Sequence, residues 1–136
     1  MIMFKLINIF TILVVFFTSH ISEATQTKVF IARVTYYWPG GGGQSGKKTA
    51  TGNIARSNKT MAVDPKIITY GSKITIPKMN KVFVAHDTGS AIKKRTASKK
   101  LGKNNIVVDV FCENRKEAMY KIKTYPMFMT IKVEPK

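Results

Sequence analysis

The chain has 136 residues, a size that allows one domain with a modest hydrophobic core. It carries 23 lysines and arginines against 7 aspartates and glutamates, and the resulting net charge of +16 indicates an anionic partner. Its single cysteine, Cys112, excludes an intrachain disulfide, so the fold must depend on its core.

The N-terminal residues have the pattern of a secretory signal peptide. Lys5 precedes an apolar run from Leu6 to Phe17, and the small residues Ser22 and Ala24 occupy positions −3 and −1 of a cleavage site. The apolar run is shorter than the ~20 residues that a membrane-spanning helix needs. We therefore expect residues 1–24 to be removed, with an uncleaved N-terminal anchor as the alternative.

The predicted export of the protein affects which anionic partner its positive charge indicates. Loss of residues 1–24 removes one lysine and one glutamate, so the mature chain keeps its net charge of +16. Such basicity would suggest nucleic acid for an intracellular protein, whereas peptidoglycan and anionic cell-envelope polymers are expected for an exported one. We expect residues 25–136 to form one monomeric domain without a stable transmembrane segment. Its expected location is the periplasm, the cell wall or outer membrane surface, or the medium.

The mature chain is predicted to be mainly β. Val, Ile, Thr and aromatic residues concentrate in short runs that are bounded by Gly, Pro, Asn or Asp. The runs predict six strands at Lys28–Tyr37, Thr60–Val63, Lys73–Pro77, Val82–Ala85, Ile106–Phe111 and Met127–Val133. With no internal repeat, this pattern favours a small closed six-stranded β-barrel over a βαβ unit.

One short helix is predicted after the fifth strand. Asn114 and Glu117 form a capping-box pattern, which predicts a helix of about two turns through Lys121. Met119 and Ile122 are expected on its inward face, with Ala118 beside them.

Two other segments are predicted to be loops. Gly40–Lys48 is rich in glycine and has no apolar residue, which is typical of a flexible hairpin tip or of a loop along a polymer-binding groove. Between Ile92 and Asn105, six basic residues accompany almost no apolar residue except Leu101. This composition indicates a solvated loop or an electrostatic guide for an anionic ligand.

The chain has only three aspartates, and each lies at or beside the end of a predicted strand: Asp64, Asp87 and Asp109. Pro65 favours an extended or turn conformation for Asp64, which leaves a turn-capping role and a site role both open. Asp109 should lie on the strand face opposite Val108 and Val110. A carboxylate there requires a groove, solvent or a partner.

A metal site or a thiol nucleophile is not expected. His86 is the only histidine once residues 1–24 are removed, which excludes multi-histidine zinc sites and the HExxH pattern. Cys112 is expected to be a small buried residue, and a Cys112–His86 nucleophile pair is a minor alternative. We expect no cofactor.

Four motifs follow one another along the mature chain: Lys-Thr-Ala-Thr-Gly (48–52), Met-Ala-Val-Asp-Pro-Lys (61–66), Val-Ala-His-Asp-Thr-Gly (84–89) and Val-Asp-Val-Phe (108–111). Their order and spacing resemble the 3D domain, a family named for three aspartates. Three features depart from the family pattern. Ser90 replaces a second glycine, early cysteines are absent, and the basic segment lengthens the connection between Asp87 and Asp109.

The resemblance implies a double-psi β-barrel, similar to those of membrane-bound lytic transglycosylase A, stationary-phase muralytic proteins and expansins. It also implies cleavage of the MurNAc–GlcNAc bond of peptidoglycan. In a lytic transglycosylase, one carboxyl protonates the leaving oxygen and then accepts a proton from the C6 hydroxyl, which gives a 1,6-anhydro product. Asp109 is expected to be this acid/base, with Asp87 raising its pKa and Asp64 in a structural or orienting role.

Motif position further implies that Tyr37, Lys48, Thr51 and Gly52 line the substrate groove. Lys48 could then contact an acidic or acetamido substituent of the glycan. Two functions of other classes are alternatives. One is a non-catalytic, expansin-like module that binds cell-wall glycan, and the other is a secreted cationic nucleic-acid binder, for which no basic-aromatic recognition motif is present.

Overall fold

The structure is a computed structural model of the chain, and it describes residues 25–41 and 46–136. The predicted signal peptide, residues 1–24, and the centre of the predicted glycine loop, residues 42–45, lie outside the described residues. Within the described ranges, no helix has the length and apolar character needed to cross a bilayer.

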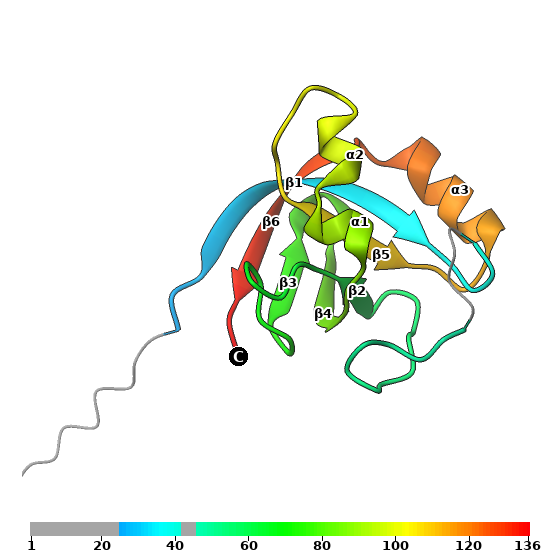
Figure 1. The fold of residues 1–136 in the computed structure, drawn as a ribbon, viewed down its shortest axis with the longest axis horizontal. Helices are drawn as coiled ribbons and strands as arrows, with labels where there is room; N and C mark the ends of the chain where they lie inside the picture. The colour runs from blue at the N-terminus through cyan, green and yellow to red at the C-terminus, as the bar shows by residue number, and fades with distance from the viewer. Residues whose placement is uncertain (1–24, 42–45) are drawn as a thin grey trace, which may run out of the picture.

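Six strands close into a barrel (Figure 1). The strands are β1 (Lys28–Tyr37), β2 (Thr60–Ala62), β3 (Lys73–Ile76), β4 (Lys81–Asp87), β5 (Val107–Phe111) and β6 (Phe128–Glu134). Their order around the barrel is β1-β5-β2-β4-β3-β6, with β1–β5 and β2–β4 parallel and the other neighbours antiparallel. The predicted six-stranded barrel is confirmed, and each predicted strand overlaps an observed one.

The barrel interior is filled by alternate residues of the strands. In β6, the buried side chains of Met129, Ile131 and Val133 alternate with more exposed ones, as expected when one face of a strand packs on a core. Val108 and Val110 of β5 belong to the same cluster and are fully buried. Asp109 therefore lies on the opposite face of β5, as predicted.

A smaller apolar cluster lies on the outer face of β5. Val107 and Phe111 pack there with Tyr37, Ala62 and Ile92. The rings of Tyr37 and Phe111 meet edge to face, with 5.3 Å between their centroids. The cluster packs β1, β2 and α1 against the face of β5 that contains Asp109.

The basic segment after β4 is folded, which corrects the predicted loop. It forms two four-residue helices, α1 (Ser90–Lys93) and α2 (Thr96–Lys99), so the chain has more than the one predicted helix. Ile92 and Ser98 are buried, and α1 and α2 contact β5 while α2 also contacts β1. The lysines of the segment face solvent while these few residues hold it on the barrel. We name residues 90–105 the basic insertion.

The helix predicted after the fifth strand is present as α3 (Arg115–Thr124), and it extends past the predicted end at Lys121. Its buried residues are Ala118, which was predicted, and Lys121, which was not. Met119 is half-buried, and the prediction that Ile122 faces inward was wrong because Ile122 is 49% exposed. On the buried face of the helix, Lys121 contacts Glu117 and Asn58. A short 3-10 helix, η1 (Pro77–Met79), connects β3 to β4.

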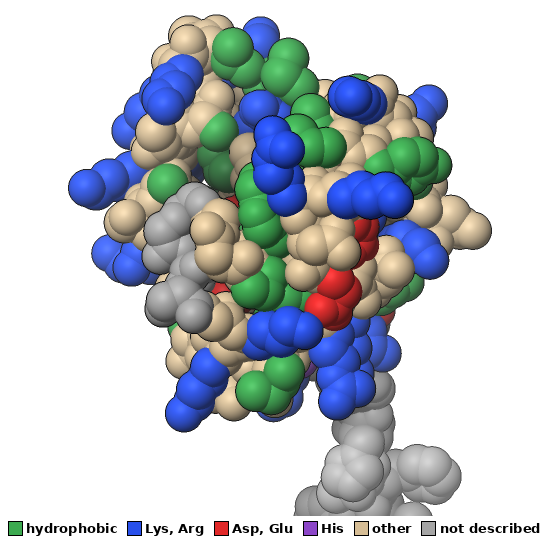
Figure 2. Space-filling view, turned by 90° about the vertical axis from the view of Figure 1, so that its right-hand side faces the viewer, with side chains coloured by type: hydrophobic (Ala, Val, Ile, Leu, Met, Phe, Trp, Pro, Cys, Tyr) green, Lys and Arg blue, Asp and Glu red, His purple; other side chains and the backbone are tan. Residues whose placement is uncertain are grey.

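Positive charge is spread widely over the surface. Figure 2 shows lysine and arginine side chains over the whole of one face, with only a few acidic side chains between them. This distribution agrees with the net charge of +16 and gives an anionic polymer many points of attraction.

Candidate functional site

A row of residues across four neighbouring strands brings two of the three aspartates together. In the barrel register, Thr35 of β1 is opposite Asp109 of β5, Asp109 is opposite Ala62 of β2, and Ala62 is opposite Asp87 of β4. Strands lie about 4.8 Å apart, so the backbones of Asp109 and Asp87 are about 10 Å apart. Ala62, which lies between them in the register, is buried in the outer apolar cluster.

A β-bulge directs Asp87 toward this row. Met61 is opposite Ala85, but the next residue, Ala62, is opposite Asp87, which makes His86 the extra residue of β4. Without the bulge, alternation would place Asp87 on the same face as the core residue Ala85. The extra residue therefore moves one carboxyl group from the barrel interior to the face that carries Asp109.

Asp109 is a partly buried acid with one hydrogen-bond partner. The Thr35 hydroxyl lies 2.9 Å from its Oδ1. Burial raises the pKa of Asp109 to about 7, the hydrogen bond from Thr35 opposes this rise, and the negative charge of Asp87 adds to it. Asp109 thus has a pKa suited to giving and taking a proton near neutral pH.

The Thr35 hydroxyl can serve both protonation states of Asp109. Its oxygen is also 3.3 Å from the carbonyl of Val108, and it has a single proton to donate. When Asp109 is ionised, Thr35 donates to the carboxylate. When Asp109 is protonated, Thr35 can donate to Val108 and accept the proton of Asp109.

Asp87 is buried and fully engaged, in contrast to Asp109. Its Oδ2 accepts from the Tyr37 hydroxyl at 2.8 Å, and its Oδ1 accepts from the backbone N–H groups of Ala50 and Thr88 at 2.9 Å. Burial, followed by the hydrogen bond to Asp87, raises the pKa of Tyr37 far above its ordinary value. The Tyr37 hydroxyl therefore keeps its proton and remains a donor to Asp87.

Asp109 lies where two pockets meet. A pocket of about 450 Å³ extends toward α2 and Met127. A second pocket, of about 240 Å³, extends toward Trp38 and Gly41. Asp109 and Ile92 line both, so a ligand passing from one pocket to the other crosses the acid.

The third aspartate is separate from this pair. Asp64 follows β2, and its Oδ1 accepts from the N–H of Lys66 at 3.0 Å, while its carbonyl accepts from Ile67 and Ile68. It shares no described hydrogen bond with Asp87 or Asp109. These hydrogen bonds are those of a residue that caps a turn.

The motif residues after the glycine loop shape the turn that contacts Asp87. Thr51 donates from both its N–H and its hydroxyl to the carbonyl of His86, at 3.2 and 2.8 Å. Gly52 has a φ of 85°, a conformation that glycine adopts without strain, and closes the turn with a bond to Thr49. Thr51 and Gly52 thus position Ala50 against Asp87, and neither lines the two pockets around Asp109.

The remaining predicted groove residues divide between the pockets and the solvent. Tyr37 lines the smaller pocket beside Asp109. Lys48 is exposed and pairs with Ile54 through the backbone, whereas its neighbour Lys47 forms an ion pair with Glu113 at 2.8 Å.

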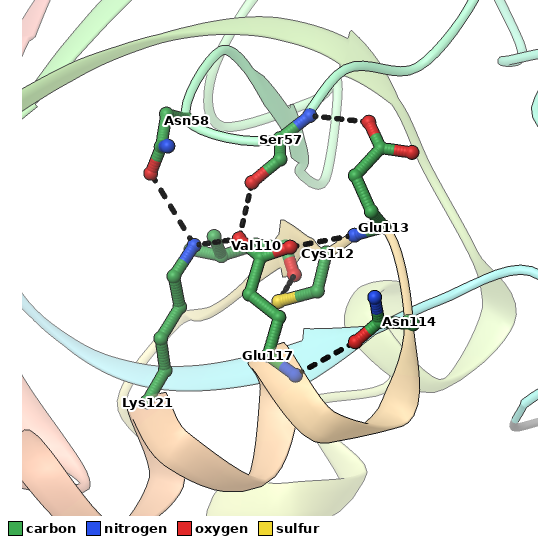
Figure 3. Close-up of polar contacts among 8 residues, drawn as sticks. All are labelled: Ser57, Asn58, Val110, Cys112, Glu113, Asn114, Glu117 and Lys121. Carbon is green, nitrogen blue, oxygen red and sulfur yellow. Dashed lines mark hydrogen bonds and ion pairs between the residues drawn. The ribbon is translucent and has the colours of Figure 1, made fainter.

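A polar network joins the segment between the glycine loop and β2 to the start of α3 (Figure 3). Glu117 accepts from the Ser57 hydroxyl, from Lys121 Nζ at 2.8 Å and from the Glu113 N–H at 2.8 Å. Lys121 also reaches Asn58 at 3.4 Å. Burial opposes ionisation of Glu117, but these hydrogen bonds outweigh it and lower its pKa. The network thus holds Ser57 and Asn58 at one end of this segment, and Ala50 near its other end contacts Asp87.

The alternative nucleophile is not supported. Cys112 is fully buried, its Sγ lies 3.8 Å from the carbonyl of Val110, and burial raises its pKa to about 12. Within residues 25–41 and 46–136, no group of three or more His, Cys, Asp or Glu residues could hold a metal ion.

Several residues that line the larger pocket were not identified as site residues from the sequence, among them Arg33, Thr35 and Lys100. Alternation along β1 places Arg33 and Thr35 on one face, but only the parallel pairing with β5 makes that face the one that carries Asp109. Lys100 was one of six basic residues in the insertion, and nothing in its sequence context separates it from the others.

Comparison with known families gives one match. The model of the 3D domain family matches residues 59–131, slightly more than half of the chain. The matched range begins just before β2 and includes Asp64, Asp87, Asp109 and the basic insertion. No curated protein matches the chain.

Proposed function

The chain belongs to the 3D domain family of peptidoglycan-related barrels, and on that premise we propose that it is a lytic transglycosylase. It would cleave the β-1,4 bond between MurNAc and GlcNAc and release 1,6-anhydro-muropeptides during peptidoglycan turnover. It needs no cofactor for this reaction.

The observation that carries the proposal is the unequal state of the two carboxyl groups. Asp109 lies between two pockets and has a pKa of about 7, whereas Asp87 is buried and accepts three hydrogen bonds. A glycoside hydrolase of the usual kind needs two carboxyl groups that act on substrate or water. One free acid/base fits a reaction in which the sugar supplies its own nucleophile.

Asp109 acts twice in the proposed reaction. It first donates its proton to the glycosidic oxygen, and the C1–O bond breaks through an oxocarbenium-like transition state. The C6 hydroxyl of the muramyl residue then attacks C1 and passes its proton to the Asp109 carboxylate. The bond from C6 oxygen to C1 closes the 1,6-anhydro ring, and Asp109 is protonated again for the next turnover.

Asp87 and Thr35 act through Asp109. The negative charge of Asp87 helps to keep Asp109 protonated, and it also favours positive charge at the nearby sugar ring. Thr35 exchanges hydrogen bonds with Asp109 as the proton leaves and returns. Asp64 contributes to the turn after β2 and not to the reaction.

We also propose that the protein is exported and acts at the cell wall. The signal-peptide pattern of residues 1–24 and the net charge of +16 support this location. N-terminal sequencing of the exported protein should give a chain that begins near Thr25. Recovery of an intact Met1 from the membrane fraction would contradict export by cleavage.

The activity is tested with purified peptidoglycan. We expect wild-type protein to release muropeptides that mass spectrometry identifies as 1,6-anhydro forms. Asp109→Asn keeps the size of the side chain but removes the transferable proton, so the rate should fall by at least ~10²-fold. Thermal unfolding of the variant should show that it is folded.

Each alternative has its own outcome. Products with a free reducing end and no anhydro ring would indicate hydrolysis. Binding of peptidoglycan without any product, equal in wild type and Asp109→Asn, would indicate the non-catalytic wall-binding module. Cleavage that survives Asp109→Asn would refute the role of Asp109.

A further inference from the structure

The larger pocket beside Asp109 combines an apolar wall with two basic side chains. Ile92, Leu101 and Met127 contribute to its wall, and Arg33 and Lys100 are its basic residues. Arg33 comes from β1, on the barrel, and Lys100 follows α2, in the basic insertion. The pocket thus exists in this form only because the insertion packs against the barrel.

Arg33 is held in place but only partly satisfied. Its Nη1 donates to the carbonyl of Val34 at 2.7 Å and to that of Met127 at 3.4 Å, and its guanidinium lies 6.0 Å from the centre of the Phe128 ring. Its Nε is buried and has no acceptor among the described residues. A buried donor without an acceptor is costly, and Nη2 makes no described hydrogen bond. A carboxylate that binds Nη2 from the pocket would also satisfy Nε if the guanidinium turned slightly, which gives two parallel hydrogen bonds.

The basic insertion holds Lys100 at the mouth of this pocket. Arg95 donates to the carbonyl of Asn104 at 2.8 Å, within the insertion, and Asn105 donates to the carbonyl of Ile31 at 2.9 Å, on β1. Lys100 itself is exposed and free to turn toward a bound anion. A fixed guanidinium and a mobile ammonium therefore face one space.

We propose that this pocket is a subsite for a carboxylate on the muramyl side of the scissile bond, bound by Arg33 and Lys100. The inference rests on the proposed function, because it takes the ligand to be a peptidoglycan strand that crosses Asp109. One guanidinium edge matches a single planar anion, and the apolar wall suits the short carbon arm that carries it. Two parts of peptidoglycan supply such a group, namely a free lactyl carboxylate and a carboxylate of the stem peptide.

Binding measurements test the subsite without relying on cleavage. The protein carries Asp109→Asn, so that bound glycan is not consumed, and the probes are three soluble glycan fragments. The first bears stem peptides, the second has free lactyl carboxylates, and the third is the second after reduction of those carboxylates to alcohols. We expect one or both of the first two to bind more tightly than the third.

The variants then locate the effect. Lys100→Gln and Arg33→Gln should each weaken binding of the carboxylate fragments about 10-fold, the scale for one hydrogen bond to a charged group. Binding of the reduced fragment should stay within about 2-fold of the parent value. Lys99→Gln removes the same charge from the neighbouring residue, which does not line the pocket, and should leave all three affinities nearly unchanged. Arg33→Lys keeps the charge but loses the bidentate edge, so it should also weaken carboxylate binding.

The outcomes separate the subsite from the function. Weakening for the lactyl fragment alone, or for the peptide fragment alone, identifies the source of the carboxylate. Equal weakening for reduced and unreduced fragments would overturn the subsite, even if wild-type protein cleaves peptidoglycan. If the carboxylate effect is present and wild-type protein yields no product, the subsite stands and the transglycosylase proposal fails.

Discussion

Asp109 and Asp87 are identical side chains that the fold places in different surroundings. Asp87 receives donors from Tyr37, Ala50 and Thr88, whereas Asp109 receives one from Thr35. Burial raises the pKa of Asp109 to about 7, and its single donor, Thr35, opposes this rise only in part. The different roles that we propose for the two acids rest on this difference in their surroundings.

Two substitutions should move the pH profile in opposite directions. Activity should fall as the pH rises through the pKa of Asp109, about 7, because the acid must carry a proton. Asp87→Asn removes a charge that raises this pKa, so the alkaline limb should move to lower pH. Thr35→Val removes a hydrogen bond that lowers it, so the limb should move to higher pH. Initial rates across a pH series measure both, and shifts of the same sign would contradict the assignment.

Asp109 should also lower the free energy of unfolding at alkaline pH. The pKa is about 7 in the folded protein and 3.8 ordinarily, so between these values the folded state holds a proton that the unfolded state has lost. Stability therefore falls as the pH rises through this window. Asp109→Asn should be more stable than wild type at about pH 8, on the order of 1–2 kcal/mol when partial exposure is allowed for, and should lose this advantage near pH 4. Urea unfolding at the two pH values measures the difference, and a gain independent of pH would show that Asp109 has an ordinary pKa.

Some of the site could be predicted from residues alone. Alternation around Val108 and Val110 correctly placed Asp109 outside the core. The orientation of Asp87 depends on a bulge at His86, which has no sequence signature here. The pocket role of Arg33 depends on which strand lies beside β1, and that is a property of the closed barrel.

At the scale of elements, strands were more predictable than helices. Most strands alternate over several residues or are rich in β-branched and aromatic residues, so their patterns can be detected. The helices α1 and α2 have four residues each, about one turn, and no period can be detected in one turn. Their anchor, Ile92, stands alone among lysines, which is why the basic insertion resembled a solvated loop.

The buried face of α3 was missed because a charged residue occupies it. Lys121 has 8% of its side chain exposed, and its charge is matched by Glu117, which is four residues earlier on the helix. Hydrophobicity therefore pointed to Ile122, whereas the packing surface facing α3 offers polar groups of Ser57 and Asn58. Only the folded loop supplies these partners.

Breaking this network should destabilise the fold. Glu117→Gln leaves Lys121 without a matching charge, at an expected cost of about 1–3 kcal/mol, below the scale for a fully buried pair because Glu117 is partly exposed. Adding Lys121→Met should recover part of the loss, since the unpaired charge is then gone. Lys123→Gln, at an exposed position of α3, is the matched control and should change little. Urea unfolding at neutral pH compares the four proteins, and a Glu117→Gln variant as stable as wild type would refute the role of the network.

At the scale of the whole molecule, charge and fold act over different ranges. Contacts such as those of Asp87 act within about 3 Å, whereas exposed lysines act over a Debye length of about 8–10 Å in physiological salt. The basic insertion acts over both ranges, because Lys100 lines the pocket that contains Asp109 and the other lysines of the insertion are exposed to solvent. Lysines there should guide an anionic polymer toward the acid, and lysines elsewhere should only hold it near the protein.

Two triple variants with equal charge test this distinction. The insertion set replaces three exposed lysines of the basic insertion with glutamine, and the control set replaces three exposed lysines elsewhere in the chain. The insertion set is Lys93, Lys94 and Lys99. The control set is Lys66, Lys78 and Lys116. Both should flatten the salt dependence of binding to anionic cell-wall material, because each removes three screened charges. The insertion set should lower the affinity at low salt several-fold more than the control set, as measured by sedimentation with wall fragments across a salt series. Equal losses would mean that net charge alone retains the protein, and unchanged binding would mean that the insertion lysines are only solvated.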